Sequence, residues 1–103
     1  MIASIATILY VDDKPKSRRF LGSVLIDCGF EVITTGDPVE AIREFGKLRL
    51  DGALIDYRLP VISGPDLALK LKTLRPDIPV VMLSGAVALP DREDPQSGSA
   101  ATK

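Results

Sequence analysis

The chain has 103 residues, of which 46% are hydrophobic and 26% are charged, and its formal net charge is −1. The length fits one compact domain, and the near-balance of charge argues against a basic nucleic-acid-binding protein and against a highly charged disordered chain. Histidine is absent and Cys28 is the only cysteine, which excludes an internal disulfide, a Ser-His-Asp or Cys-His nucleophile and the usual zinc sites.

Four short apolar runs predict buried β-strands, at residues 5–11, 31–35, 53–55 and 80–83. Three of them are nearly continuous and β-branched, which is typical of strands covered on both faces. The first run has no positively charged leader and ends at Asp12 and Asp13, so we expect a strand and not a signal peptide. No run approaches the length of a membrane span, and we therefore expect a cytoplasmic protein that contacts no membrane.

The segments between these runs have apolar residues at helical spacing. The first predicted helix carries Phe20, Leu21, Val24, Leu25 and Cys28 on one face. Gly29 follows as a stop signal, and Cys28 is expected to be a small core residue because nothing around it suggests an activated thiol.

The second predicted helix begins with a capping box, in which Asp37 is the N-cap, Pro38 is the first helical residue and Glu40 is the third. Its apolar face consists of Ala41, Ile42, Phe45 and Leu48. The third helix begins near residues 63–66, ends at Pro76 and carries a stripe formed by Leu67, Leu71 and Leu74.

Strands that alternate with helices predict an α/β fold with a doubly wound parallel sheet and right-handed crossovers. Residues 1–87 are expected to form this domain. Residues 88–103 contain Pro90, Pro95, Gly98 and a charged cluster without apolar periodicity, so we interpret them as a loop or a disordered tail.

Polar residues follow three of the predicted strands at their carboxyl ends. Asp12 and Asp13 follow the first strand, Asp56 the third and Ser84 the fourth. These ends meet at one edge of a parallel sheet, so the side chains should converge there. A divalent cation is the simplest way to offset the repulsion of three carboxylates, and Mg²⁺ takes carboxylate ligands without histidine. An aspartate can also be a nucleophile toward phosphorus, with the Ser84 hydroxyl bonding a phosphoryl oxygen.

Three motifs of the sequence resemble those of one family. They are VDD at residues 11–13, DYRLP at residues 56–60 with Gly64 beyond, and PVVMLSGA at residues 79–86. Residues 29–32 and 75–79 agree with the family's entries into its second and fourth strands. In order and spacing, residues 5–86 closely resemble a two-component response-regulator receiver domain.

This resemblance implies a flavodoxin-like fold with strand order 2-1-3-4, in a phosphorelay receiver that takes its phosphoryl group from a histidine kinase or a phosphotransfer protein. It implies that Asp56 is the phospho-acceptor. It also implies a Mg²⁺ site made by Asp12, Asp13, Asp56 and the backbone carbonyl of Arg58. Any catalysis would be phosphorylation and dephosphorylation of its own aspartate, and the protein would not be a metabolic enzyme.

The other site residues are assigned by the same resemblance. Ser84 matches the switch hydroxyl, and Gly85 and Ala86 match the small residues of the phosphate loop. Pro60 and Gly64 match positions that shape the loop into the third helix. Tyr57 lies in the same motif and is expected to be a partly exposed loop residue.

The sequence resembles a receiver domain that is truncated at its C-terminus. The family's fifth strand, the lysine after it and the last helices have no counterpart in the sequence. Lys103 is a poor match to that lysine. Without a fifth strand, the apolar strand at residues 80–83 becomes a sheet edge, which favours a homodimer through this side. The expected rate of phosphorylation is low, since a charge-stabilising donor is missing.

Other interpretations remain open. The chain could be a non-signalling receiver that acts only as a binding or dimerisation module. A phosphatase or hydrolase with Asp12 as nucleophile would require further catalytic residues that the sequence does not offer. The basic cluster of Lys14, Lys16, Arg18 and Arg19 is either a solvated helix face or a surface that docks a partner or steers phosphate.

Overall fold

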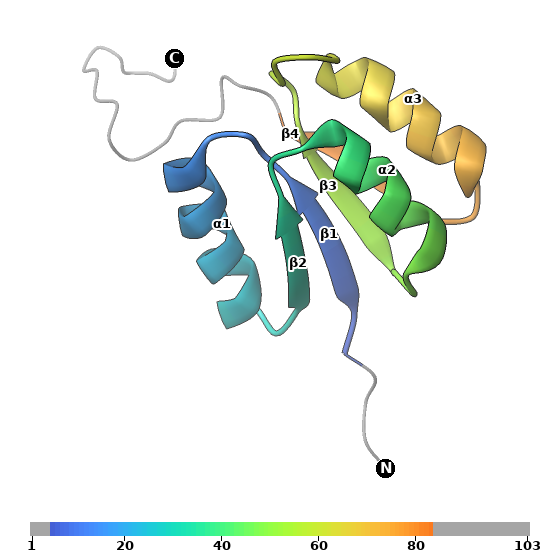
Figure 1. The fold of residues 1–103 in the computed structure, drawn as a ribbon. Helices are drawn as coiled ribbons and strands as arrows, with labels where there is room; N and C mark the ends of the chain where they lie inside the picture. The colour runs from blue at the N-terminus through green and yellow to red at the C-terminus, as the bar shows by residue number, and fades with distance from the viewer. Residues whose placement is uncertain (1–4, 84–103) are drawn as a thin grey trace, which may run out of the picture.

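The computed structural model describes residues 5–83 of the chain. Four strands form one parallel sheet with the order β2-β1-β3-β4, as Figure 1 shows. The strands are β1 (Thr7–Val11), β2 (Glu31–Thr35), β3 (Gly52–Asp56) and β4 (Val80–Leu83). The predicted α/β flavodoxin-like order is therefore confirmed. The predicted tail at residues 88–103 lies outside the described residues.

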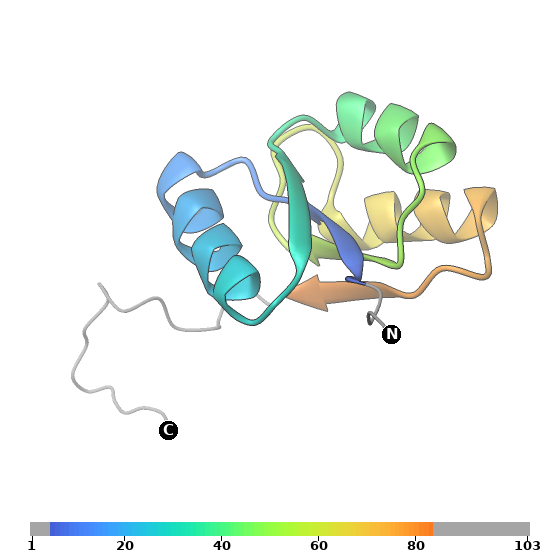
Figure 2. The same ribbon diagram turned by 90° about the horizontal axis from the view of Figure 1, so that it is seen from below.

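Three helices connect the strands and lie on both faces of the sheet. They are α1 (Pro15–Asp27), α2 (Pro38–Lys47) and α3 (Gly64–Leu74). Figure 2 shows α1 on one side of the sheet and α2 with α3 on the other. None of the helices within residues 5–83 has the length and apolar character needed to cross a membrane.

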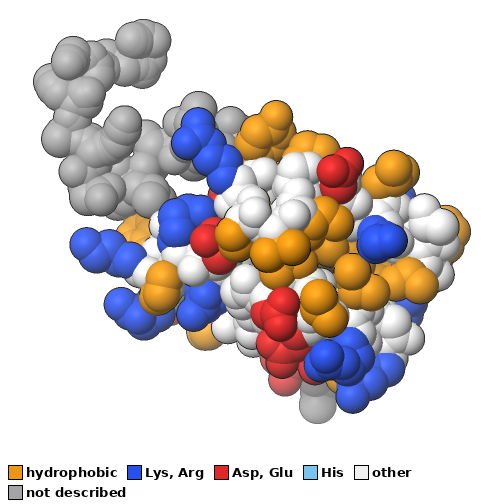
Figure 3. Space-filling view, turned by 45° about the horizontal axis from the view of Figure 1, so that its top comes forward, with side chains coloured by type: hydrophobic (Ala, Val, Ile, Leu, Met, Phe, Trp, Pro, Cys, Tyr) orange, Lys and Arg blue, Asp and Glu red, His pale blue; other side chains and the backbone are white. Residues whose placement is uncertain are grey.

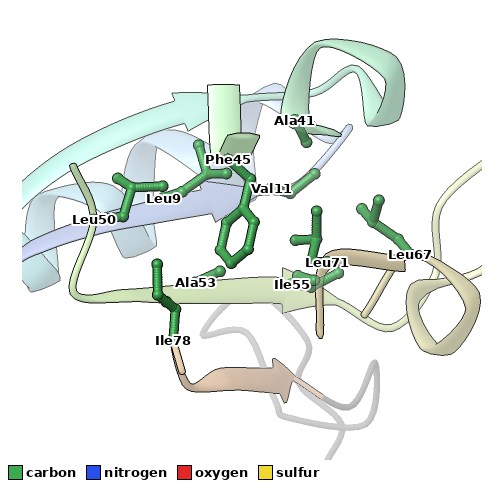
Figure 4. Packing of buried hydrophobic residues seen from close by; sticks show 10 residues of the cluster. All are labelled: Leu9, Val11, Ala41, Phe45, Leu50, Ala53, Ile55, Leu67, Leu71 and Ile78. Atoms are coloured by element: carbon green, nitrogen blue, oxygen red, sulfur yellow. The ribbon is translucent and has the colours of Figure 1, made fainter. Parts of the chain in front are cut away.

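The main core lies between the sheet and the pair α2 and α3. Leu9 and Val11 of β1 face the core together with Ala53 and Ile55 of β3, because alternate residues of a strand point the same way. Phe45 projects from α2 onto these strands (Figure 4) and is fully buried. The remaining buried residues of the cluster are Ala41, Leu50, Leu67, Leu71 and Ile78.

The opposite face is covered by α1, which packs on β1 and β2. The buried residues of α1 are Ser17 and Gly22, and small residues let the helix approach the sheet closely. Beyond α1, a shallow groove of about 260 Å³ runs along β3 and β4. Apolar residues of the helix and strands line this groove, among them Ile8, Leu25, Leu54 and Val81.

Four residues of the predicted apolar helix faces are exposed, so the prediction is wrong for them. Three belong to α1, namely Cys28 at its C-cap, Phe20 with 47% and Val24 with 38% of its surface exposed. The reason is that α1 meets the sheet through Ser17 and Gly22, which leaves the outer part of its predicted apolar face toward solvent. Leu74, at the end of α3, is likewise 48% exposed.

The start of α2 differs from the predicted capping box. The Asp37 side chain does accept a hydrogen bond from the Val39 amide at 3.0 Å. Glu40, however, does not bond back to the Asp37 amide. Its carboxylate accepts a 2.7 Å bond from the Thr35 hydroxyl, and that hydroxyl oxygen in turn accepts from the Asp37 amide at 3.1 Å. Thr35 at the end of β2 therefore replaces the reciprocal contact. Elsewhere the predicted signals hold, since Gly29 takes a φ of 102° after α1.

Candidate functional site

The carboxyl ends of β1 and β3 bring three aspartates together, as the sequence predicts. Asp12 and Asp13 follow β1 directly, and Asp56 is the last residue of β3. One carboxylate oxygen from each lies within 4.8 Å of the other two. Asp12 and Asp56 are buried, with 3% and 7% of their surface exposed, whereas Asp13 is partly exposed. The cluster is thus a concentrated negative charge at the rim of the sheet.

Asp12 is held by fixed donors on both of its carboxylate oxygens. The Tyr10 hydroxyl donates to Oδ2 at 2.7 Å, and the Lys14 amide donates to Oδ1 at 2.9 Å. Arg18 donates to the Asp12 backbone carbonyl at 2.7 Å. Burial and the bond to Asp12 both raise the pKa of Tyr10, so its hydroxyl keeps the proton that it donates. Asp12 is therefore positioned from the strand and from α1 together.

The Lys14 ammonium lies within the acidic cluster. Its Nζ atom is 2.6 Å from Asp56 Oδ2, 3.1 Å from Asp13 Oδ1 and 3.5 Å from Asp12 Oδ1. It also lies 3.4 Å from the Arg58 carbonyl oxygen. Burial alone would lower the pKa of Lys14, but the hydrogen bonds to Asp56 and Asp13 outweigh it and the pKa is raised. The side chain is consequently a positive charge at neutral pH.

The loop from β3 to α3 closes tightly over Asp56. The Gly64 amide donates to the Tyr57 carbonyl at 2.9 Å. A Cβ atom at Gly64 would lie 2.5 Å from the Asp56 carbonyl oxygen and 2.7 Å from the Tyr57 backbone, so only glycine fits. Pro60 is exposed in this loop. Tyr57 is 49% exposed, which confirms the expected partly exposed loop residue.

Three further predicted residues, Ser84, Gly85 and Ala86, lie outside the described residues. The basic cluster divides in two within the structure. Lys14 turns into the acidic site and Arg18 contacts the Asp12 backbone, whereas Lys16 and Arg19 are exposed. Lys and Arg side chains gather on the side of the molecule where α1 lies (Figure 3). The interpretation as a solvated face alone is therefore incomplete for Lys14 and Arg18, which also contact the site.

Tyr10 is the site residue that sequence reasoning missed. It was included in an apolar strand, although a tyrosine two residues before a buried aspartate lies on the same side of the strand and can reach it. That spacing was the available signal. Nothing comparable in the sequence predicts that Lys14, and not Lys16, reaches across to Asp56.

The residues present fit a divalent cation. The four groups predicted as ligands, namely the three carboxylates and the Arg58 carbonyl, all surround the Lys14 ammonium. Oxygen atoms from different segments thus already converge on one cation, and an all-oxygen set suits Mg²⁺. A larger hollow of about 650 Å³ lies at the opposite ends of β1 and β2, lined by residues such as Thr7, Glu31 and Arg49. It contains none of the predicted site residues.

Sequence relatives include both regulators and kinases. The chain is 34% identical over 85 residues to the transcriptional regulatory protein PrrA of Mycobacterium tuberculosis, which covers 82% of this chain and 36% of PrrA. It is 33% identical over 79 residues to the autoinducer 1 sensor kinase/phosphatase LuxN of Vibrio campbellii, which covers 77% of this chain and 9% of LuxN. The chain therefore spans only a minor part of these curated relatives.

The fold has close counterparts among solved structures. The response regulator protein TrrA of Thermotoga maritima, in complex with Mg²⁺-BeF, superposes with a TM-score of 0.76 at 29% identity, over 81% of this chain and 72% of that one. The family model described as "Response regulator receiver domain" matches residues 8–99. Because that match extends over most of the sequence and the fold agrees with it, the chain belongs to the response regulator receiver domain family.

Proposed function

We propose that this receiver domain accepts a phosphoryl group on Asp56 from a histidine kinase or a phosphotransfer protein. The observation that carries the proposal is the convergence of Asp12, Asp13 and Asp56 within 4.8 Å at the end of β1 and β3. It is supported by the family match and by relatives that include both regulators and sensor kinases. A cytoplasmic location stays a prediction.

The proposed chemistry uses Asp56 as the nucleophile. One carboxylate oxygen attacks the phosphorus of a phosphohistidine, the P–N bond breaks, and the imidazole leaves and takes up a proton. Attack of water on the resulting acyl phosphate releases inorganic phosphate and restores the carboxylate. Asp56 is the last residue of β3, and the buried strand fixes the direction of its side chain.

Asp12, Asp13, Asp56 and the Arg58 carbonyl would hold Mg²⁺. When bound, the ion supplies positive charge that offsets the charge on the transferring phosphoryl oxygens. Tyr10 and the Lys14 amide keep the Asp12 carboxylate in place for this role. Gly64 holds the Arg58 loop against Asp56, because only glycine permits the close approach. Ser84, Gly85 and Ala86 are proposed to contact the phosphoryl group, and Pro60 to shape the loop.

Intact mass measurement tests the phospho-acceptor. Incubation of the full chain with Mg²⁺ and a small acyl phosphate is expected to add the mass of one phosphoryl group, and Asp56→Asn to abolish the addition. Asp51→Asn is the matched control, since Asp51 is an exposed carboxylate at the other end of β3. Phosphorylation that persists in Asp56→Asn, or that is equally lost in Asp51→Asn, would overturn the assignment.

A second candidate function is self-association through β4. Within residues 5–83, β4 is the outermost strand of the sheet on its side; its Val81 is 56% exposed and lines the apolar groove beside Leu54. An apolar sheet edge is a template for strand pairing, and a second copy of this chain would supply the same edge about a two-fold axis. Sedimentation over a wide range of protein concentration tests for such a homodimer. This candidate is compatible with a receiver that binds without signalling.

A further inference from the structure

Lys14 has a position that neither the family match nor the proposed phosphotransfer explains. It follows the acidic pair directly and is the N-cap residue of α1. Its ammonium contacts Asp56 Oδ2 and Asp13 Oδ1, and it lies near the Arg58 carbonyl. Within residues 5–83, it is the only basic side chain that forms an ion pair with these carboxylates.

The contacts of Lys14 use the same oxygens that are proposed to ligate Mg²⁺. A Mg²⁺ ion requires its oxygen ligands at about 2.0–2.1 Å. An ion bound to both Asp13 Oδ1 and Asp56 Oδ2 would therefore lie within the space that the ammonium now holds, since the ammonium contacts both of these atoms. Two cations at such a short distance repel each other strongly. The ammonium and the metal ion therefore compete for the space beside these oxygens.

The Lys14 side chain also has room to move toward solvent. It is 48% exposed, whereas the side chains of Asp12 and Asp56 are 4% and 9% exposed. The ammonium is held on the solvent side by a flexible four-carbon stem. Asp12 is fixed by hydrogen bonds from Tyr10 and the Lys14 amide, and Asp56 is a buried residue at the end of β3. Entry of a metal ion would consequently move the lysine and leave the carboxylates in place.

We propose that Lys14 is a built-in counterion that competes with Mg²⁺ for the acidic site. In the metal-free protein, the ammonium neutralises part of the charge of the three carboxylates. Binding of the ion displaces it toward solvent, so the observed affinity for Mg²⁺ is lower than the oxygens alone would give. This inference rests on the proposed metal site and adds a residue that sets its affinity.

Calorimetric Mg²⁺ titration of Lys14→Gln tests the competition. Glutamine keeps a polar side chain but removes the charge, and we expect the Kd for Mg²⁺ to fall about tenfold, which corresponds to about 1.4 kcal/mol. The matched control is Lys16→Gln, which removes the same charge from an exposed position on α1 and should change Kd less than twofold. Lys14→Arg restores a cation and should return the Kd toward the wild-type value.

Thermal unfolding gives a second measurement that does not depend on phosphorylation. Lys14→Gln should lower Tm in the absence of Mg²⁺, because the carboxylates lose their counterion, and Mg²⁺ should raise its Tm more than that of the wild type. A Kd in Lys14→Gln equal to or weaker than that in Lys16→Gln would overturn the inference while leaving the metal site intact. Absence of Mg²⁺ binding in all variants at tens of millimolar would overturn the proposed metal site as well.

Discussion

The two faces of the sheet are built by different means. On the face toward α2 and α3, apolar side chains such as Leu9, Ile55 and Phe45 are sealed from water. On the face toward α1, apolar contacts are joined by polar ones, since the Tyr10 hydroxyl lies 3.5 Å from the Ser17 carbonyl and donates to Asp12. Beyond α1, the same face exposes Val81.

Because of this difference, the residues that stabilise the fold and those that position the acidic site lie on different faces of one small domain. The α2–α3 face holds the cluster of buried hydrophobic residues, and burial of such surface is the dominant favourable contribution to folding. The α1 face uses its polar contacts to orient the acidic residues at the end of β1, through Tyr10 and Arg18. Substitutions on the first face should therefore change stability, and those on the second should change the site or the association of the protein.

The largest effect is expected from a phenylalanine on the sealed face. Phe45→Ala removes a ring with no exposed surface and leaves a cavity, which should lower the free energy of unfolding by about 3–5 kcal/mol. Phe20→Ala is the matched change on the α1 face, where the ring is 47% exposed, and should cost about 1 kcal/mol. Urea unfolding followed by circular dichroism measures both. Equal losses would contradict the division between the two faces.

A smaller effect is expected from the hydroxyl on the α1 face. Tyr10→Phe keeps the ring but leaves Asp12 Oδ2 without the 2.7 Å bond that it accepts in the protein. An unsatisfied buried acceptor should lower the free energy of unfolding by about 1–3 kcal/mol. Thermal unfolding with and without Mg²⁺ is the measurement. A variant as stable as the wild type would show that the hydroxyl does not hold Asp12.

The smallest effect on folding, and a specific effect on association, is expected at β4. Val81→Lys places a charge on an exposed edge position and should change the free energy of unfolding by no more than about 0.5 kcal/mol. The same change should keep the protein monomeric in sedimentation experiments where the wild type associates. Val39→Lys, at an exposed valine of α2, should leave association unchanged. A wild type that stays monomeric at high concentration would contradict self-association through β4.

Most of the fold could be predicted because short-range signals and burial agree. The runs at residues 31–35 and 80–83 match β2 and β4 residue for residue. Strand–helix alternation predicts the parallel sheet, and the family resemblance implies its order. The errors occur where tertiary contacts determine which side chains are buried or hydrogen-bonded. Phe20 and Cys28 fit a helical stripe, yet α1 turns Ser17 and Gly22 to the sheet. Similarly, Glu40 fits a capping box, but its carboxylate accepts from the Thr35 hydroxyl on β2.

The candidate site could be predicted in part. The meeting of Asp12, Asp13 and Asp56 follows from the geometry of parallel strands and is found in the structure. The counterion could be predicted only in part. The sequence places Lys14 directly after the acidic pair, but whether its side chain reaches Asp56 depends on the backbone direction at residues 12–15.

The exposed thiol of Cys28 has a practical consequence for studying this molecule. As the sole cysteine of the chain, it has no partner for a disulfide within the chain, and a disulfide between two copies would join them at the C-terminal end of α1. Association at β4 therefore has to be measured under reducing conditions. The same thiol is a natural attachment point for a single fluorophore. Separated from the acidic site by the 13 residues of α1, about 20 Å along the helix, such a label would report on the domain without touching its chemistry.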